Sequence, residues 1–152
     1  METIEFNSKS ASYSELSNFH LSPFMLEGKM WPTVEHYFQA QKFPADPELQ
    51  ERIRAAKTSL GAKRLGRTKT PAFRSDWEIV KDELMEKGIK AKFQQNPVLA
   101  TLLVGTGSAW LIEKAPRDSY WGSGPNGCGK NKTGHIIMRV RSALAEHPSL
   151  SL

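Results

Sequence analysis

Apolar residues in the second half of the chain recur at the spacing of amphipathic helices. From 76 to 94, one side of the expected helix carries apolar residues at intervals of three, four and seven: Trp77, Val80, Leu84 and Ala91. The last helix is expected to bury a second stripe of four residues, Ile136, Ile137, Val140 and Leu144. We expect both stripes to face the core.

Residues that cap helix N-termini mark where the helices begin. Thr33, next to Pro32, predicts a helix that runs to about Phe43. An Asp or Asn directly before a proline also predicts a start, because proline fits the first helical position. Further starts are expected at Asp46, Thr58, Ser75 (as a capping box with Glu78), Asn96 and Asn131.

Three short apolar runs predict strands at 3–6, 24–26 and 110–113. The chain contains no internal repeat and no long linker. We therefore predict an α+β fold: a single compact, helix-rich domain over 1–146 with a small β-sheet. Residues 147–152 are expected to form a flexible C-terminal tail.

Composition narrows the class of protein. The 152 residues are 39% hydrophobic and 24% charged, which is ordinary for a folded domain. No apolar run approaches the length of a membrane span, and the acidic N-terminus does not resemble a secretory signal. One cysteine, Cys128, excludes an internal disulfide, so we expect a cytoplasmic protein. The four histidines lack zinc-site spacing, and we expect no metal and no cofactor.

Positive charge is concentrated in one segment. Residues 52–74 contain eight basic and no acidic residues, within a net charge of +5 for the chain. Such a segment suits a phosphorylated partner, either a small ligand or a nucleic acid. The alternative is a solvated helix face that serves solubility, and charge alone does not choose between these.

A carboxylate, an amide and an amine share one face of the helix expected after Thr33. Glu35, Gln39 and Lys42 lie at i, i+4 and i+7. The alternative is an exposed polar stripe with a weak ion pair. Two features favour a site: the helix dipole stabilises an ionised Glu35 in the first turn, and large flat side chains, including Trp31, flank it. His36 is either an acid or base or, more simply, a structural hydrogen-bonding group.

A glycine-rich loop precedes the last helix. Four glycines within 122–129 allow backbone N–H groups to approach a ligand, and the helix start adds further donors. We expect the loop to hold an anion, with Tyr120 and Trp121 stacking on a base or sugar and Lys130 adding charge. The alternative is a flexible surface loop. The spacing of the four glycines matches neither a P-loop nor a Rossmann loop. Nothing in the sequence activates Cys128 as a nucleophile.

Six motifs together resemble the NADAR (YbiA-like) family. The two long ones are WPTVEHYFQAQKF at 31–43 and YWGSGPNGCGKN at 120–131. The shorter ones are SNF at 17–19, LGR at 65–67, DWEIVK at 76–81 and KFQQN at 92–96. The resemblance covers nearly the whole chain in the same order, and it implies a helix-rich α+β fold and an N-glycosidase.

Two family activities are implied. One branch hydrolyses phosphorylated ribosylamino intermediates of early riboflavin biosynthesis and releases ribose 5-phosphate. The other removes ADP-ribose from guanine in DNA. Both substrates contain a ribose with an exocyclic amine and a nearby phosphate. Two classes without catalysis stay open: a module that only binds ADP-ribose or NAD, and a nucleic-acid binder that uses 52–74.

The resemblance also implies site residues. Glu35 is the expected catalytic carboxylate, which stabilises an oxocarbenium-like state and orients water. Lys42 is a second catalytic candidate, because an amine can form a Schiff base with a ring-opened aminal. Substrate-binding roles are expected for Asn18, Trp31, His36, Gln39, Arg67, Trp77, Asp118, Tyr120, Trp121, Gly122, Lys130 and Asn131.

Overall fold

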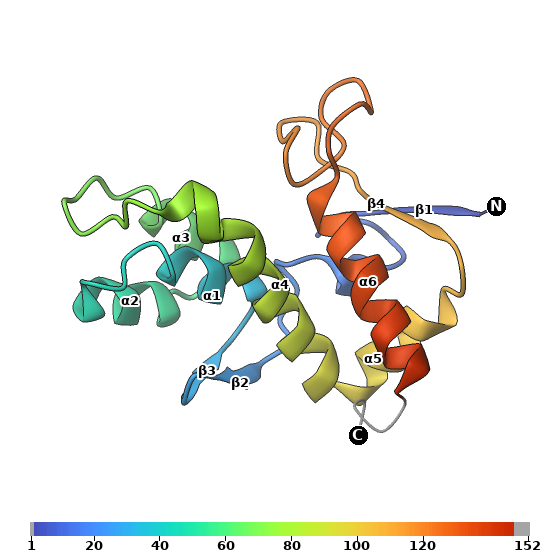
Figure 1. Cartoon of the computed structure of the whole chain (residues 1–152), viewed down its shortest axis with the longest axis horizontal. Coiled ribbons are helices and arrows are strands. Elements are labelled where there is room, and N and C mark those ends of the chain that lie inside the picture. Colours follow the sequence, from blue (N-terminus) through green and yellow to red (C-terminus); the bar gives the residue numbers. More distant parts are fainter. Residues whose placement is uncertain (1, 148–152) are drawn as a thin grey trace. The chain divides into compact units, whose positions relative to one another are not determined.

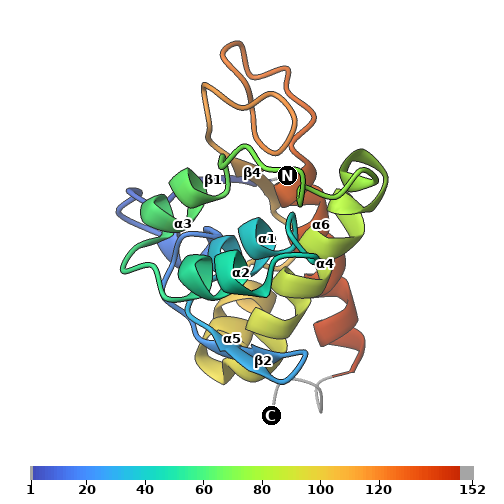
Figure 2. The same ribbon diagram turned by 90° about the vertical axis from the view of Figure 1, so that its left-hand side faces the viewer.

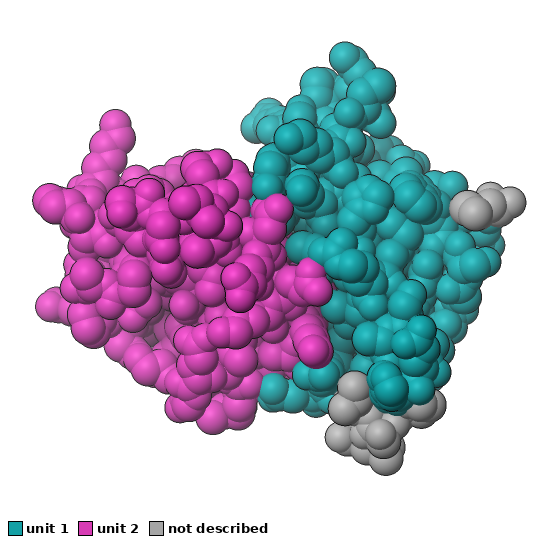
Figure 3. All heavy atoms as spheres, in the orientation of Figure 1, with its two compact units in different colours: residues 1–17, 93–152 teal, residues 18–92 magenta. Residues whose placement is uncertain are grey.

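The computed structural model describes residues 2–147 and divides the chain into two units. Unit 1 comprises residues 1–17 and 93–152, and unit 2 comprises residues 18–92 (Figure 3). Each unit contains one two-stranded sheet and several helices. The predicted α+β class is confirmed, and the expected small sheet is present as two separate pairs of strands.

Unit 1 is built around a parallel pair of strands (Figure 1). Strand β1 (Thr3–Phe6) pairs with β4 (Trp110–Glu113), with Ile4 opposite Leu111. Helix α6 (Lys132–Glu146) packs on β4, and α5 (Pro97–Gly105) contacts both α6 and the short 3-10 helix η1 (Ser14–Leu16). The predicted stripe of α6 is confirmed, since all four of its residues are buried.

Unit 2 combines a hairpin with four helices (Figure 2). The hairpin joins β2 (Phe24–Leu26) to β3 (Lys29–Trp31). Three short helices follow, α1 (Val34–Ala40), α2 (Pro47–Arg54) and α3 (Ser59–Leu65), and α1 packs against the other two. Helix α4 (Trp77–Gln95) belongs to this unit through Lys92.

Three predicted caps are present in unit 2. The side chains of Thr33, Asp46 and Thr58 accept backbone N–H bonds from His36, Leu49 and Gly61 at 3.0 to 3.1 Å. Each bond satisfies a donor that the first helical turn would otherwise leave unpaired. Helix α1 ends at Ala40, before the expected Phe43, and tighter turns carry the chain onward to Pro44.

Helix α4 differs from its prediction. The carbonyl of Asp76 accepts the first helical bond, from Val80, so the helix begins at Trp77, one residue later than a capping box at Ser75 requires. Val80 and Leu84 are only half-buried, while Met85, Ile89 and Phe93 are buried. One turn before Met85, the same row contains Lys81, whose side chain is only 14% exposed. Because a lysine can bury its apolar stem while its amine reaches solvent, this row does not appear apolar in the sequence.

Two predictions concern the ends of the chain. A single domain over 1–146 stays a prediction, as does the flexible tail over 147–152, of which residues 148–152 lie outside the described part. Within 2–147, no helix has both the length and the apolar character that crossing a bilayer requires.

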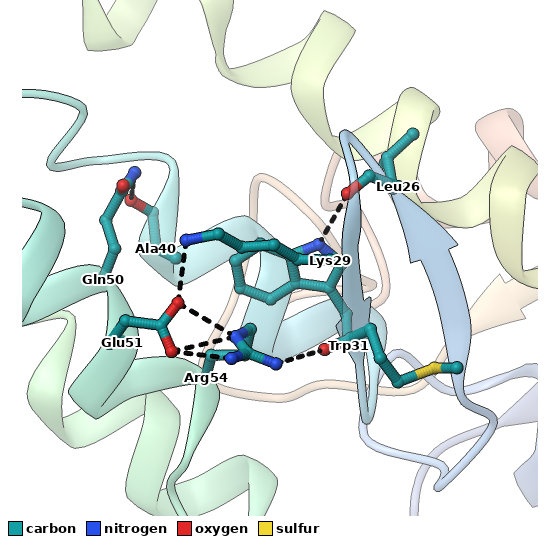
Figure 4. A network of polar contacts seen from close by, with 8 residues as sticks. Leu26, Lys29, Trp31, Ala40, Gln50, Glu51 and Arg54 are labelled. Carbon is teal, nitrogen blue, oxygen red and sulfur yellow. Dashed lines mark hydrogen bonds and ion pairs between the residues drawn. The ribbon is translucent and has the colours of Figure 1, made fainter.

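A polar network joins the hairpin to α2 (Figure 4). The carboxylate of Glu51 accepts from Lys29 at 2.7 Å and from Arg54 at 2.7 Å. Arg54 also donates to the carbonyl of Met30, and the Trp31 indole donates to the carbonyl of Leu26. The network fixes the start of the segment that leads into α1.

We expect Glu51→Gln to lower the free energy of unfolding near neutral pH, because the ion pairs with Lys29 and Arg54 are lost. The loss should be only about 1 kcal/mol, because these ion pairs are exposed to solvent. Hydrogen bonds from Arg54 and Lys29 lower the pKa of Glu51 to about 2. The carboxylate therefore stabilises the fold at pH values above its unfolded pKa, and this contribution is lost as pH falls toward 2. Urea unfolding at several pH values tests this, and a difference between the two proteins that persists at pH 2 would contradict it.

Candidate functional site

Helix α1 is buried along its whole length. Glu35 is 7% exposed and Gln39 is 5% exposed, so the polar face predicted from the sequence is not a solvated stripe. Burial of a carboxylate costs free energy unless other groups compensate it. The structure therefore excludes the solvated-stripe alternative, and Glu35 stays a candidate for the catalytic carboxylate.

Contacts with Gln39 and with Asn18 hold Glu35 in place. The Gln39 side-chain amide donates to the carboxylate, with 2.6 Å from Nε2 to Oε2. The backbone N–H of Glu35 donates to the carbonyl of Asn18 at 3.1 Å. Asn18 in turn donates through Nδ2 to the sulfur of Met85 on α4 at 3.4 Å. Asn18, Glu35 and Gln39 thus form one connected group, as the sequence predicted for the last two.

Lys42 lies beyond the end of α1, in a turn. Its Nζ donates to the carbonyl of Gly66 at 3.4 Å and lies 5.7 Å from the centroid of the Trp77 ring. Burial lowers the pKa of Lys42 below its ordinary value. The charge of Glu35 opposes this shift, while the positive charges of Arg67 and Lys63 add to it. The amine therefore loses its proton more readily than an exposed lysine does.

Two carbonyl oxygens in this group are buried without a partner. Asn18 Oδ1 and Gln39 Oε1 accept no hydrogen bond within the described residues. Asn18 is 6% exposed, so its oxygen has little access to bulk water. A buried acceptor without a donor is costly in a folded protein. A ligand with hydroxyl or amine donors relieves that cost at Asn18.

The structure places two predicted binding residues in the supporting core. The His36 ring lies between Thr33 Oγ1, at 2.7 Å, and the Ala56 carbonyl, at 2.9 Å, and burial lowers the pKa of His36. Trp31 is 4% exposed and packs edge-on against Tyr37. The polar atoms of both side chains therefore form hydrogen bonds within the protein. Among residues 2–147, no cluster of His, Cys, Asp and Glu is arranged to hold a metal ion.

Trp77 and Arg67 complete the unit 2 group. Trp77 is 7% exposed, and its ring packs against Phe38 with 4.9 Å between the ring centroids. Arg67 follows α3, is exposed, and is close enough for its charge to act on Lys42. Trp77 is thus mainly a core residue with a cation on its face, and Arg67 is an accessible positive charge.

The glycine-rich loop belongs to unit 1, and hydrogen bonds to the Asp118 side chain and to the start of α6 hold it. Asp118 Oδ1 accepts from the N–H groups of Tyr120 and Trp121 at 3.0 and 2.8 Å. The first N–H groups of α6, from Lys132 and Thr133, donate to the carbonyls of the same two residues. These two N–H groups at the helix start are therefore not the unpaired donors that the sequence predicted.

Close packing within unit 1 explains two glycines of the loop. A side chain at Gly129 would overlap the carbonyl of Gly122, and one at Gly122 would press on Ala115 at 2.6 Å. Gly129 is therefore needed where two stretches of the loop backbone meet, and Gly122 where the backbone passes the Ala115 side chain. The positive charge of the loop comes from Lys130 and Lys132, whose amines lie 5.4 and 5.5 Å from the Tyr120 ring centroid.

Asn131 precedes α6 in a left-handed conformation, with φ 51°, and does not cap the helix with its side chain. Instead it donates to the carbonyl of Leu111 at 2.9 Å and accepts from the N–H of Glu113 at 3.0 Å. It thereby ties the start of α6 to β4. The side chain predicted to bind substrate is buried and serves this link.

We expect Asn131→Ala to lower the free energy of unfolding by about 2–3 kcal/mol, because two backbone groups of β4 lose their partner and alanine disfavours positive φ. Asn131→Gly loses the same bonds but tolerates the conformation, so its loss should be smaller. Chemical denaturation measures both. Equal stability of Asn131→Ala and the unmodified protein would refute this role.

Sequence reasoning missed Gly66 as part of the unit 2 group. Its carbonyl accepts from Lys42, and a side chain at this position would overlap the Gln39 carboxamide. In the sequence, Gly66 stands out only as part of the LGR motif at 65–67, and the charge of Arg67 accounts for that motif without giving the glycine a role. Met85 was also missed, because its contact is made by a sulfur on an apolar helix row.

Comparisons with known proteins show which family and which relatives the chain resembles. The NADAR domain family model matches residues 5–145. N-glycosidase YbiA from Shigella boydii is 45% identical over 142 residues, or 93% of this chain and 88% of that protein. A riboflavin biosynthesis protein from Vibrio vulnificus is 38% identical over 151 residues, or 99% of this chain and 41% of that protein. The NMR structure of E. coli YbiA superimposes with a TM-score of 0.87 at 42% identity, covering 97% of this chain and 88% of that one.

Proposed function

We propose that the substrate of this protein is a phosphorylated ribosylamino compound. The chain belongs to the NADAR domain family and is a hydrolase of N-glycosyl compounds. The class is that of early riboflavin biosynthesis intermediates, and ribose 5-phosphate is the released sugar. The riboflavin-related name of the Vibrio relative supports this choice. The observation that carries the proposal is the buried Glu35 carboxylate, oriented by Gln39.

Glu35 supplies the negative charge that the reaction needs. Cleavage of an N-glycosidic bond develops positive charge on the sugar, and a carboxylate with little access to water stabilises that charge strongly. The same carboxylate orients or deprotonates the attacking water. Asn18 Oδ1, which lacks a donor, accepts from a hydroxyl or amine of the substrate, and the exposed Arg67 attracts its phosphate.

Lys42 gives the site a second route. A ring-opened aminal exposes C1 to attack by the neutral amine, which forms a Schiff base and expels the base; water then hydrolyses the imine and returns the amine. The lowered pKa of Lys42 supports this route. We place Glu35-assisted attack of water first, because the Schiff-base route requires Lys42 to lose its proton before it can attack.

ADP-ribosylated guanine in DNA is the competing substrate. The observation that favours it is the exposure of Arg64, Arg67 and Lys69 in a segment without acidic residues. Phosphates of a DNA strand bind such a surface with strong salt dependence. A module that binds ADP-ribose without hydrolysis is the competing function of another class.

Base release, measured by mass spectrometry on both substrates side by side, tests the proposal. We expect free pyrimidine and ribose 5-phosphate from the ribosylamino-pyrimidine phosphate, and much slower release of ADP-ribose from the modified oligonucleotide, whose guanine is thereby restored. The reverse preference would assign the chain to removal of ADP-ribose from DNA. Binding of ADP-ribose without turnover of either substrate would show a binding module instead.

A further inference from the structure

Gly66 is a glycine without a conformational reason. It follows α3 with φ −63° and ψ −13°, a right-handed helical conformation that every residue adopts easily. Alanine is the better residue in such a place, because it loses less backbone entropy on folding. The reason for glycine must therefore be sought in what surrounds it.

The Gln39 side chain fills the space beside Gly66. A methyl group there would overlap Oε1 of Gln39 and lie 2.6 Å from its Cδ and 3.1 Å from its Cβ. The side chain of Gln39 on α1, rather than any backbone atom, is thus the group that glycine accommodates. Gly66 is itself buried.

The orientation of that carboxamide follows from Glu35. Gln39 Nε2 donates to the carboxylate, so Oε1 must point the other way, toward Gly66. The reverse orientation would set two acceptors against each other. Oε1 has no hydrogen-bond partner within the described residues. No hydrogen bond to Oε1 holds the carboxamide in this position. The carboxamide can point its Nε2 at Glu35 because the space beside Gly66 accommodates Oε1.

We propose that Gly66 is a positioning residue: its missing side chain leaves the room in which the Gln39 carboxamide holds the Glu35 carboxylate. The Gly66 carbonyl also accepts from Lys42, so one residue fixes both candidate catalytic groups. The proposal deepens the proposed function and rests on it for its catalytic part. It explains the middle residue of the LGR motif at 65–67.

Gly66→Ala is the direct test. The far end of the Gln39 side chain is the group that yields most easily, so the protein stays folded while the bond to Glu35 is lost. We expect kcat to fall on the order of 10- to 100-fold, with little change in KM, because a displacement of about 1 Å is enough for such a loss. Gly105→Ala is the matched control, since that helix-terminal glycine has open space around it.

The double variant isolates the mechanism. Gln39→Ala removes the clashing atoms together with the bond to Glu35. If Gly66 acts through Gln39, then Gly66→Ala lowers kcat in the original background and changes it less than twofold in the Gln39→Ala background. Equal losses in both backgrounds, or a Gly66→Ala protein as active as Gly105→Ala, would overturn the proposal.

A stability cycle separates this proposal from the proposed function. Melting temperatures of the unmodified protein, both single variants and the double variant need no substrate. We expect Gly66→Ala to lower the melting temperature less, or to raise it, when residue 39 is alanine. This coupling is expected even if no base is released from any substrate, which would refute only the function. Additive shifts would refute the contact itself.

Discussion

Replacing Glu35 with glutamine is expected to lower kcat about 10³-fold, because the neutral amide can neither balance positive charge on the sugar nor activate water. The side chain keeps its shape, and its oxygen can still accept from Gln39 Nε2. We therefore expect the variant to fold and to bind ribose 5-phosphate. Steady-state kinetics, a melting curve and calorimetric titration of ribose 5-phosphate measure the three properties.

Glu51→Gln is the matched control for this prediction. It makes the same substitution in unit 2 at an exposed ion pair outside the candidate site. We expect it to lower stability slightly and to leave kcat near that of the unmodified protein. A Glu35→Gln protein with the same turnover as this control would remove Glu35 from the mechanism.

Lys42→Met is expected to lower kcat on the order of 10²- to 10³-fold, because it removes the cation that lies between the Gly66 carbonyl and the Trp77 ring. The methionine side chain fills a similar volume, so the fold should persist. Single-turnover base release measures the loss. Activity within threefold of the unmodified protein would remove Lys42 from the mechanism.

The pH dependence of kcat distinguishes two roles for Lys42: an ammonium that donates a proton to the leaving base in the Glu35 route, and a neutral amine that attacks C1. Burial lowers the pKa of Lys42, so its proton is lost at a lower pH than in free lysine. If the ammonium is the active form, kcat falls as pH rises through this pKa. If the neutral amine attacks C1, kcat rises instead, and borohydride traps substrate on the protein. We expect the fall and no trapped adduct, since the Glu35 route comes first.

Local signals in the sequence were sufficient for much of unit 2. The side-chain caps at Thr33, Asp46 and Thr58 depend only on neighbours three residues away, so they are readable without tertiary information. The spacing of Glu35 and Gln39 on one helix face predicted their contact for the same reason. Whether that face is buried distinguishes a candidate site from a solvated polar stripe, and its burial depends on packing against other helices.

Features that depend on distant contacts were missed or misread. The N–H donors at the start of α6 are taken by carbonyls of Tyr120 and Trp121, and no local pattern reports that the loop folds back on its helix. Strand β3 has three residues and forms only because β2 pairs with it. Gly66 has an ordinary backbone conformation, so only the position of Gln39 reveals why it is glycine.

Hydrolysis that depends on Glu35 is the central claim, and product analysis tests it most directly. The ribosylamino-pyrimidine phosphate is mixed with an excess of the protein or of Glu35→Gln, and pyrimidine and ribose 5-phosphate are quantified over time. We predict equal amounts of the two products from the unmodified protein and almost none from the variant at the same times. Equal product formation by both proteins, or intact substrate that stays bound to the unmodified protein, would contradict the claim.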